Sequence, residues 1–237
     1  MNILITGAGR GIGNALVREL ASRGGHNLIA LSRNKTKIDE LAQACNEKFP
    51  SSRVSAYYMD LESDNKVYKA LFEFVEKDYG QLDILVNNAG YLVNKPFGSL
   101  EIEDERKMWL TNYLAPSQLI RLLLPILGLN EKGHVINISS MGGVQGSQKF
   151  PGLSSYSASK SALATLTECL AEENKSENIA FNCIALGAVQ TEMLEEAFPG
   201  YKANIKAEDL AVYLADFCLY GMKYCNGKIL PFSLSQP

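Results

Sequence analysis

A tyrosine and a lysine lie four residues apart in the stretch LSSYSASKSA, residues 153–162. On an α-helix, positions i and i+4 project from the same face, with their Cβ atoms about 5–6 Å apart. A cation held beside a partly buried phenol favours the phenolate form and lowers the pKa of the tyrosine. Tyr156 and Lys160 therefore predict a pair that could do acid–base chemistry near neutral pH. The spacing alone also fits a surface tyrosine and a surface lysine that happen to be neighbours, so the rest of the chain must decide.

A glycine-rich segment, TGAGRGIG at residues 6–13, follows the first apolar run and opens the first helical pattern. Its spacing is G-x-x-x-G-x-G through Gly7, Gly11 and Gly13, whereas G-x-G-x-x-G fails from Gly7 because Ile12 takes the third position. Glycines let a backbone approach a pyrophosphate, which then lies on the free N–H groups of a helix N-terminus. A tight connection that binds nothing is the alternative, but the place between a strand and an amphipathic helix favours phosphate binding.

The residues after the second apolar run indicate which nucleotide is bound. An NAD site places Asp or Glu there to bond the ribose 2′-hydroxyl. Here Ser32 takes that position, Arg33 follows, and Arg10 lies inside the glycine turn. Two guanidinium groups without a competing carboxylate suit a 2′-phosphate, which predicts NADP(H) in preference to NAD(H). Arg33 could instead be a solvated residue at the start of a loop.

Apolar runs alternate with helical patterns along the whole chain. The runs have the length and β-branched content of parallel strands buried on both faces. Their alternation predicts an α/β fold of the Rossmann type, a doubly wound parallel β-sheet in three α/β/α layers, as a single domain over residues 1–237. Ser63 is the expected N-cap of the third helix. The expected strands are 2–6, 27–31, 54–59, 82–87, 134–139, 179–186 and 226–234, and the expected helices are 12–22, 35–48, 64–79, 101–127, 155–174 and 207–219.

The composition argues against several classes of function. The 237 residues carry a net charge of −3, which provides no basic surface for nucleic acid. No apolar run reaches the length of a membrane span, and the N-terminus lacks the positive region of a signal peptide, so we expect a cytoplasmic protein without a membrane partner. Five cysteines without a C-x-x-C pair and two distant histidines predict reduced thiols and no metal site.

The ordered set of motifs resembles the short-chain dehydrogenase/reductase family, in its compact single-domain branch. The motifs run in family order and at family-like intervals from residue 6 to residue 191. The resemblance implies an enzyme that transfers a hydride between a nicotinamide cofactor and a small-molecule carbonyl or alcohol. The motifs are TGAGRGIG (6–13), DL (60–61), NNAG (87–90), LTNYLAP (110–116), INISS (136–140), YSASK (156–160) and LGAVQT (186–191).

The resemblance implies four catalytic roles. Tyr156 is the general acid or base, and Lys160 lowers its pKa and bonds the nicotinamide ribose, because a free tyrosine with a pKa near 10 is a poor base at pH 7. Ser140 stabilises charge on the substrate oxygen. Ser139 competes for that role, but neighbours on a strand point to opposite faces, and the MGG that follows favours Ser140. Asn112 extends a proton relay through a water near Lys160, unless it is an ordinary helix-interior asparagine.

The remaining implied contacts concern the cofactor. The DL segment lines the adenine pocket, NNAG the adenosine ribose and phosphate, and LGAVQT the nicotinamide carboxamide. NNAG could also be an ordinary turn, and Asp60 a strand-end cap. Leu186-Gly187 replaces the usual Pro-Gly but keeps the glycine. The predicted cofactor site comprises Gly7, Arg10, Gly11, Ile12, Gly13, Ser32, Arg33, Asp60, Leu61, Asn88, Ala89, Gly90, Tyr156, Lys160, Gly187, Val189 and Thr191.

The substrate contacts come from less regular parts of the chain. The loop after Ser140, longer than the common family pattern, and the segment 187–206 are the expected substrate region, with Met141, Phe150, Leu153 and Met193 as apolar candidates. Ordinary loop packing explains these four equally well. The segment after Thr191 has no cluster of Arg or Lys for a large anion. A small or moderately apolar ketone, aldehyde or 3-oxoacyl group is therefore expected.

Two other functions compete with a reductase. A cofactor-sensing protein would bind NADP(H) without turnover, but it has no need of the Tyr156–Lys160 pair. A sugar-nucleotide epimerase or dehydratase shares Tyr-x-x-x-Lys, but this chain leaves little room for a substrate lobe. The resemblance also implies a homodimer or homotetramer, in which the helices at 101–127 and 155–174 pair between subunits.

Overall fold

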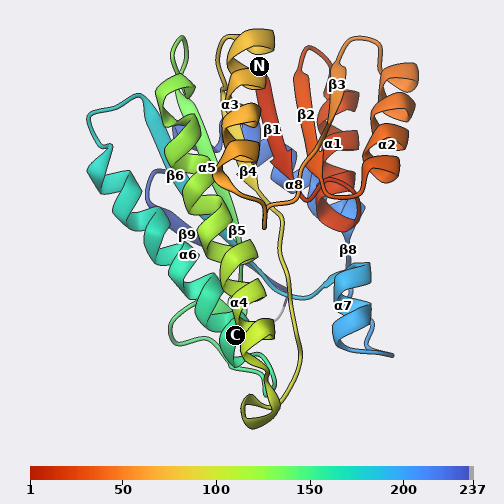
Figure 1. Ribbon diagram of the computed structural model, residues 1–237, viewed down its shortest axis with the longest axis vertical. Helices are drawn as coiled ribbons and strands as arrows, with labels where there is room; N and C mark the ends of the chain where they lie inside the picture. Colours follow the sequence, from red (N-terminus) through yellow and green to blue (C-terminus); the bar gives the residue numbers. More distant parts are fainter. Residues whose placement is uncertain (235–237) are drawn as a thin grey trace.

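A seven-stranded parallel sheet forms the centre of the computed structural model, which describes residues 1–234 (Figure 1). Its strands are β1 (Asn2–Thr6), β2 (Asn27–Ser32), β3 (Arg53–Tyr58), β4 (Ile84–Asn87), β5 (Gly133–Ser140), β6 (Ile179–Leu186) and β9 (Lys228–Phe232). The spatial order is β3-β2-β1-β4-β5-β6-β9. Strands β2 and β3 therefore lie on one side of β1, and β4, β5, β6 and β9 follow on its other side. This order confirms the doubly wound fold, and it creates a switch point between β1 and β4, where such sheets bind ligands.

The inner strands are apolar because both of their faces are covered. All four residues of β4 and all eight of β6 are buried. At the centre, Ile5 of β1 pairs with Ala30 of β2 on one side and with Val86 of β4 on the other. Such strands lack the polar alternation of a half-exposed sheet, which is why continuous apolar runs marked them in the sequence.

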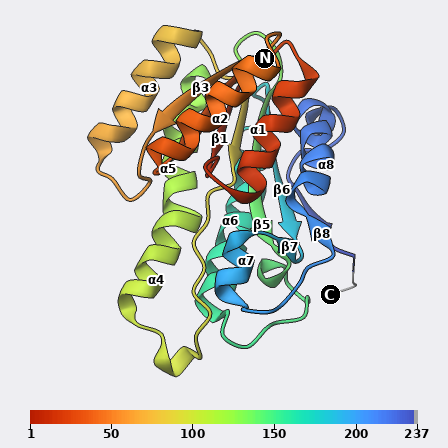
Figure 2. The same cartoon turned by 90° about the vertical axis from the view of Figure 1, so that its right-hand side faces the viewer.

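Helices cover both faces of the sheet and complete the predicted three layers (Figure 2). One cluster of buried apolar side chains joins one face to α1 (Gly11–Arg23), α2 (Lys35–Lys48) and α8 (Ala207–Tyr220). A second cluster joins the other face to α3 (Asn65–Tyr79), α5 (Ala115–Leu123) and α6 (Ser154–Glu173). Burial of this apolar surface is the main favourable contribution to folding.

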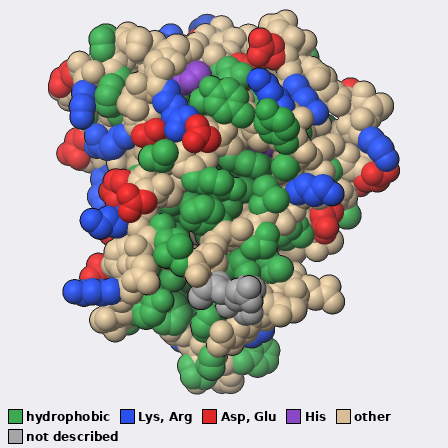
Figure 3. All heavy atoms as spheres, turned by 180° about the vertical axis from the view of Figure 1, so that it is seen from behind, with side chains coloured by type: hydrophobic (Ala, Val, Ile, Leu, Met, Phe, Trp, Pro, Cys, Tyr) green, Lys and Arg blue, Asp and Glu red, His purple; other side chains and the backbone are tan. Residues whose placement is uncertain are grey.

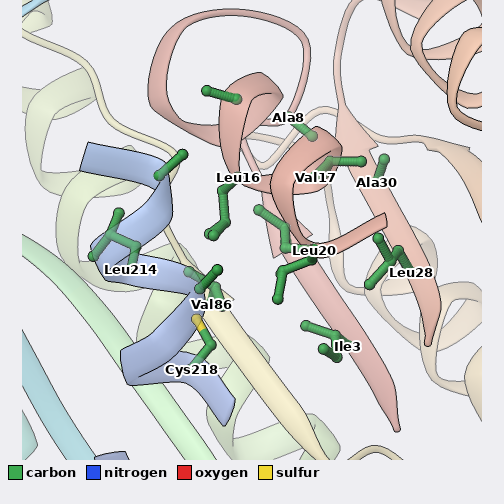
Figure 4. Packing of buried hydrophobic residues seen from close by; sticks show 14 of the residues in the cluster. Ile3, Ala8, Leu16, Val17, Leu20, Leu28, Ala30, Val86, Leu214 and Cys218 are labelled. Atoms are coloured by element: carbon green, nitrogen blue, oxygen red, sulfur yellow. The ribbon is translucent and has the colours of Figure 1, made fainter. Parts of the chain in front are cut away.

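The helix α8 differs on its two sides. Seen from behind, hydrophobic side chains gather on the face that contains α8 and β9, where Val212 and Tyr213 are partly exposed (Figure 3). On the inner side, Leu214 of α8 belongs to the same buried cluster as Leu16 and Leu20 of α1 (Figure 4). The helix is thus anchored to α1 and the sheet, while its outer side carries both apolar side chains and the carboxylates of Glu208, Asp209 and Asp216.

The long helix expected at 101–127 is interrupted, which corrects that prediction. It consists of α4 (Ile102–Trp109), a π-helical turn (Leu110–Leu114) and α5, followed by a 3₁₀ turn (Leu124–Ile126). The N–H of Ala115 bonds the carbonyl of Leu110. Pro116 has no N–H to offer the carbonyl of Asn112, four residues earlier, so the regular ladder cannot run through this point.

The start of α3 also differs from the prediction. Ser63 is not its cap; Asp64 is, and its Oδ1 accepts hydrogen bonds from the backbone N–H groups of Lys66 at 2.9 Å and Val67 at 3.4 Å. A carboxylate at this position also interacts favourably with the helix dipole. Strand β4 begins at Ile84, because Leu82 forms only an isolated bridge with Leu127.

The segment 187–206 contains elements that the sequence did not reveal. Strands β7 (Val189–Gln190) and β8 (Ile205–Lys206) form a separate parallel pair, and α7 (Glu192–Ala197) lies between them. These elements are too short to produce a periodic pattern. They form a small unit that projects beyond the carboxyl ends of the main sheet (Figure 2).

Residues 1–234, the described part of the chain, lack two kinds of feature. No helix there is long and apolar enough to cross a membrane. Within the same residues, no three His, Cys, Asp or Glu side chains gather as a metal site would require. All five cysteines are free.

Candidate active site

One cavity of about 920 Å³ lies at the carboxyl ends of the strands, within the upper range of small-molecule sites. It extends from the glycine turn and the end of β2, past the ends of β4 and β5, to α7 and the first turn of α6. All predicted site residues line it except Gly13 and Asn112. Those that line it are Gly7, Arg10, Gly11, Ile12, Ser32, Arg33, Asp60, Leu61, Asn88, Ala89, Gly90, Ser140, Met141, Phe150, Leu153, Tyr156, Lys160, Gly187, Val189, Thr191 and Met193.

The glycine turn brings the first loop against the end of β4. A Cβ on Gly7, whose φ is +70°, would lie 2.8 Å from the Cα of Ala89. A Cβ on Gly13 would lie 2.5 Å from the carbonyl oxygen of Gly7, so this glycine allows α1 to pack on the turn and does not line the cavity. Helix α1 begins at Gly11 without an acidic residue in its first turn. Its N–H groups and positive dipole end therefore fit a pyrophosphate.

The NNAG segment fastens this turn to the sheet. The Thr6 Oγ1 accepts hydrogen bonds from the backbone N–H groups of Asn88 and Ala89, both at 3.0 Å. The Asn88 side-chain amide donates to the carbonyl of Thr6 at 2.9 Å. The segment therefore connects the end of β4 to the glycine turn, and its last three residues also line the cavity.

The end of the cavity beside β2 contains three cations. Ser32 lines it in place of an acidic residue, and Arg33 is 66% exposed. Lys37, in the first turn of α2, lines the same cavity. It was not predicted from the sequence, although its position four residues after Arg33 could have indicated a third cation near the nucleotide. Arg10 forms two hydrogen bonds with Glu196 of α7, one of them at 3.0 Å. This pairing raises the pKa of Arg10 and lowers that of Glu196.

Asp60 contributes to the loop after β3 as well as to the cavity wall. Its Oδ1 accepts a hydrogen bond from the backbone N–H of Glu62 at 3.0 Å, so it does act as a strand-end cap. The Glu62 carboxylate lies 4.0 Å from the Arg33 guanidinium, and Glu196 is paired with Arg10, so the expectation of two guanidinium groups without a competing carboxylate is wrong. The neighbouring Leu61 lines the cavity and accepts a hydrogen bond from the Tyr68 hydroxyl at 2.8 Å through its carbonyl.

The candidate catalytic groups meet where β5 ends and α6 begins. The Tyr156 and Ser140 side chains interact there, and the Ser140 Oγ accepts a hydrogen bond from the backbone N–H of Gly142 at 3.3 Å. Lys160 is buried, and its Nζ donates to the carbonyl of Ile138 at 2.7 Å. Ser139 donates its hydroxyl to the carbonyl of Lys160 at 2.8 Å, so this hydroxyl fixes α6 against β5. Of the two serines, Ser140 is the one whose hydroxyl reaches Tyr156.

The acidities of this cluster differ from the expected ones. Burial raises the pKa of Tyr156 to about 12, against a smaller opposing effect of the hydrogen bond with Ser140. Burial also lowers the pKa of Lys160 to about 8, against a smaller effect of Cys183. Lys160 is not among the groups that shift the pKa of Tyr156 here, so its lowering of that pKa stays a prediction. Loss of hydration disfavours both charged forms, and the ammonium is directed to the Ile138 carbonyl.

Asn112 is fully buried and does not line the cavity. Its Oδ1 accepts from the backbone N–H of Tyr91 at 2.8 Å, and its amide donates to the Tyr91 carbonyl at 2.9 Å and to the Ser159 hydroxyl at 3.0 Å. Ser159 in turn donates to the carbonyl of Tyr156 at 2.7 Å. The side-chain amide is thus committed to holding the segment after β4 against α6, and it cannot also donate to a relay.

The wall beyond Tyr156 is formed by loops. The four apolar candidates line the cavity there, with Met141 and Leu153 buried and Phe150 half-exposed. Thr191 caps α7 by accepting a hydrogen bond from the backbone N–H of Leu194 at 3.3 Å. Further lining residues were missed because no periodic pattern marks these loops; they include Tyr91, Leu92, Gln148, Phe198 and Tyr201.

Comparison with known proteins places this geometry in a family. A family model described as short chain dehydrogenase matches residues 1–202. The chain is 33% identical over 202 residues to an NADP-dependent 3-hydroxy acid dehydrogenase of Schizosaccharomyces pombe, covering 84% of this chain and 76% of that protein. It is therefore a protein of the Rossmann-fold oxidoreductase class.

Solved structures agree with this class. The L-sorbose reductase from Gluconobacter frateurii, complexed with NADPH and L-sorbose, superposes with a TM-score of 0.86 at 26% identity, over 99% of this chain and 95% of that one. A 7α-hydroxysteroid dehydrogenase complexed with NADH gives a TM-score of 0.89 at 26% identity, over 99% and 93% of the two chains. The chain belongs to the short-chain dehydrogenase/reductase family, and it is an enzyme of the dehydrogenase or reductase type.

Proposed function

We propose that this enzyme is an NADP(H)-dependent reductase of carbonyl or 3-oxoacyl compounds. The proposal depends on one observation: the Tyr156 hydroxyl, the Ser140 hydroxyl and the buried Lys160 meet on one cavity wall, in the cavity that the glycine turn also lines. A tyrosine whose pKa is about 12 keeps its proton at neutral pH. It therefore holds the proton that reduction of a carbonyl oxygen requires.

Each side chain has a defined task in this mechanism. The nicotinamide supplies the hydride when it is bound. Tyr156 gives its proton to the substrate oxygen as negative charge develops there, and Ser140 donates a hydrogen bond to the same oxygen. An ammonium has three N–H groups, so Lys160 retains two for ribose hydroxyls beyond the one used by the Ile138 carbonyl.

We propose that Asn112 takes part in the proton relay through its backbone carbonyl, and not through its side chain. The side-chain amide is committed to Tyr91 and Ser159. Pro116 withholds the hydrogen bond that would otherwise reach the Asn112 carbonyl in a regular helix. A water bonded to this carbonyl near Lys160 would carry protons to the site.

The cofactor preference rests on the cations beside β2. Arg10, Arg33 and Lys37 line that end, and Ser32 presents no carboxylate to a ribose 2′-hydroxyl. We expect NADPH to bind more tightly than NADH, and we expect Arg33→Ala to weaken NADPH binding about tenfold while leaving NADH binding unchanged. Isothermal titration with both nucleotides measures this difference. Equal affinities for the two nucleotides in the wild-type protein would remove the preference.

The activity is tested by following NADPH absorbance with a panel of ketones, aldehydes and 3-oxoacyl thioesters. Turnover of at least one carbonyl compound is expected, and Tyr156→Phe should abolish it while NADPH still binds. Tight binding of NADPH without turnover of any compound would contradict the proposal.

The segment 187–206 is the proposed substrate region, and the single domain of residues 1–237 is the proposed extent of the functional unit.

We also propose a homodimer or homotetramer that pairs α4, α5 and α6 between subunits. Trp109 is 37% exposed and Leu114 48% exposed, although both are large apolar side chains. Light scattering after gel filtration should show a dimer or tetramer that dissociates in the Trp109→Glu, Leu114→Glu double variant. Leu129→Glu, at an exposed loop position, is the matched control. A monomeric wild-type protein would contradict this arrangement.

A further inference from the structure

Three segments that are distant in sequence meet beyond Tyr156. The backbone N–H of Lys95 donates to the carbonyl of Gly152 at 3.1 Å, which joins the segment after β4 to the segment before α6. The Asn94 amide donates to the carbonyl of Ala197 at 2.9 Å, which joins it to the end of α7. The segments 91–95, 150–153 and 193–201 therefore form one wall of the cavity.

Except for Glu196, which is paired with Arg10, the side chains of this wall that line the cavity are apolar or aromatic. Its lining side chains include Leu92, Phe150, Leu153, Met193, Phe198 and Tyr201. A Cβ on Gly90 would lie 3.8 Å from the Met193 Cε and 3.6 Å from the Lys160 Nζ. The wall is thus adjacent to the catalytic cluster, at the place where the substituents of a substrate carbonyl would lie.

The lysines near this wall are occupied elsewhere. Lys149 directs its Nζ to the carbonyl of Gly142 and the hydroxyl of Ser147, both at 2.9 Å, and also to the carbonyl of Val144. Lys95 pairs with Asp104 at 2.6 Å. Neither lysine lines the cavity. The cations that do line it are Arg10, Arg33 and Lys37 at the β2 end, and the buried Lys160.

A substrate anion at this wall would therefore lose water beside the Glu196 carboxylate, while the nearest cations are already bonded, Arg10 to Glu196 and Lys160 to the Ile138 carbonyl. Burial of an unpaired carboxylate is strongly unfavourable, whereas an alkyl, aryl or ester group gains from contact with the same side chains. We propose that the substrate end accepts uncharged carbonyl compounds with an apolar or aromatic substituent and rejects the corresponding carboxylates. This inference rests on the proposed function for its catalytic step, in which hydride and proton reduce the carbonyl to an alcohol and NADPH becomes NADP⁺.

A matched pair of ketones provides the test. Methyl 4-acetylbenzoate and 4-acetylbenzoate share the reacting carbonyl and differ in charge at the far end of the ring. We expect kcat/KM with NADPH to be about 30-fold or more higher for the ester. Equal values, or a preference for the acid, would overturn the inference.

Two variants show whether the wall is responsible. Tyr201→Arg places a cation on the cavity wall at a half-exposed position, and it should reduce the ester-to-acid ratio at least fivefold. Tyr224→Arg makes the same change at an exposed position that does not line the cavity, and it should leave the ratio unchanged. An unchanged ratio in Tyr201→Arg, or an equal change in both, would contradict the role of the wall.

Binding measurements separate this inference from the proposed function. Calorimetric titration of the protein–NADP⁺ complex with the ester and the acid should show the same preference without any turnover. If the ester binds selectively but neither ketone is reduced, the proposed function fails and the inference stands. If both ketones are reduced equally well, the inference fails and the proposed function stands.

Discussion

The two ends of the cavity differ in charge and in the kind of structure that forms them. At the β2 end, charged side chains of both signs lie beside a helix N-terminus, and the walls are the ends of regular strands and helices; these side chains are Arg10, Arg33, Lys37, Asp60, Glu62 and Glu196. At the other end, the lining is apolar and aromatic, and the walls are loops and the short α7. The catalytic cluster lies between these two ends.

The difference shows how the fold divides binding from specificity. A phosphate-bearing ligand needs donors and cations at fixed positions, which strand ends and a helix N-terminus supply. An apolar substituent needs only a complementary surface, which loops can supply in many forms. The same chemistry at Tyr156 can therefore serve different substrates when only the loops change.

The largest effect is expected from a substitution that removes the proton donor and leaves both ends of the cavity unchanged. In Tyr156→Phe, the proton donor is lost, and kcat/KM for carbonyl reduction should fall roughly 10²- to 10⁴-fold. NADPH affinity should change little, because the cations at the β2 end are untouched. Stopped-flow absorbance and titration with NADPH measure the two quantities, with Tyr220→Phe, at a half-exposed position on α8, as the control. Activity above a tenth of the wild-type value would contradict the assigned role.

A second prediction concerns the buried cation between the two ends. The pKa of Lys160 falls from 10.5 in the unfolded chain to about 8 in the fold, so the fold disfavours its charged form by on the order of 3 kcal/mol at pH 7. Between about pH 8 and 10.5 the unfolded chain binds more protons, and this unfavourable contribution disappears as pH rises. Lys160→Met should therefore be inactive but unfold at a higher temperature than the wild type at pH 7.

The stability gain of Lys160→Met should shrink at pH 10, which calorimetry at the two pH values can check. Lys175→Met changes a lysine that is 72% exposed and should leave the midpoint unchanged at both values. A lower midpoint for Lys160→Met at pH 7 would mean that the ammonium stabilises the fold, contrary to this account.

A third change should damage only the nucleotide end. In Gly13→Ala, the new Cβ would lie 2.5 Å from the Gly7 carbonyl oxygen, and α1 must move away from the turn. Overpacking of this kind should weaken NADPH and NADH binding alike, roughly 10- to 100-fold. Gly98→Ala is the matched control, because a Cβ there meets nothing within 4 Å. Unchanged nucleotide affinity in Gly13→Ala would place the pyrophosphate elsewhere.

The smallest expected effect concerns the contact that links α7 to the nucleotide end. Glu196 occupies the Arg10 guanidinium, which a 2′-phosphate would also need. Because this ion pair is exposed, Glu196→Gln should tighten NADPH binding only about two- to fivefold, and NADH binding should not change. Glu195→Gln is the neighbouring control. Weaker NADPH binding in Glu196→Gln would show that Glu196 instead holds Arg10 in position for the cofactor.

The sequence predicted the nucleotide end better than the substrate end, and the reason is physical. Backbone geometry dictates residue type at the glycine turn, since a Cβ at Gly7 would clash, and the buried strands require apolar runs. Tyr201 and Phe198 line the cavity through tertiary packing of loops, which leaves no local pattern. The burial that raises the pKa of Tyr156 was not predicted, because spacing reveals neighbours but not burial. The π-helical turn was missed, although Pro116 was a usable signal.

The most direct test of the account is to follow the hydride itself. With NADPH dideuterated at C4 of the nicotinamide and methyl 4-acetylbenzoate, mass spectrometry should find one deuterium on the carbinol carbon of the product. Tyr156→Phe should bind the same nucleotide and form almost none of this product. Consumption of NADPH without deuterium in the alcohol, or equal transfer in the variant, would contradict hydride transfer at this site.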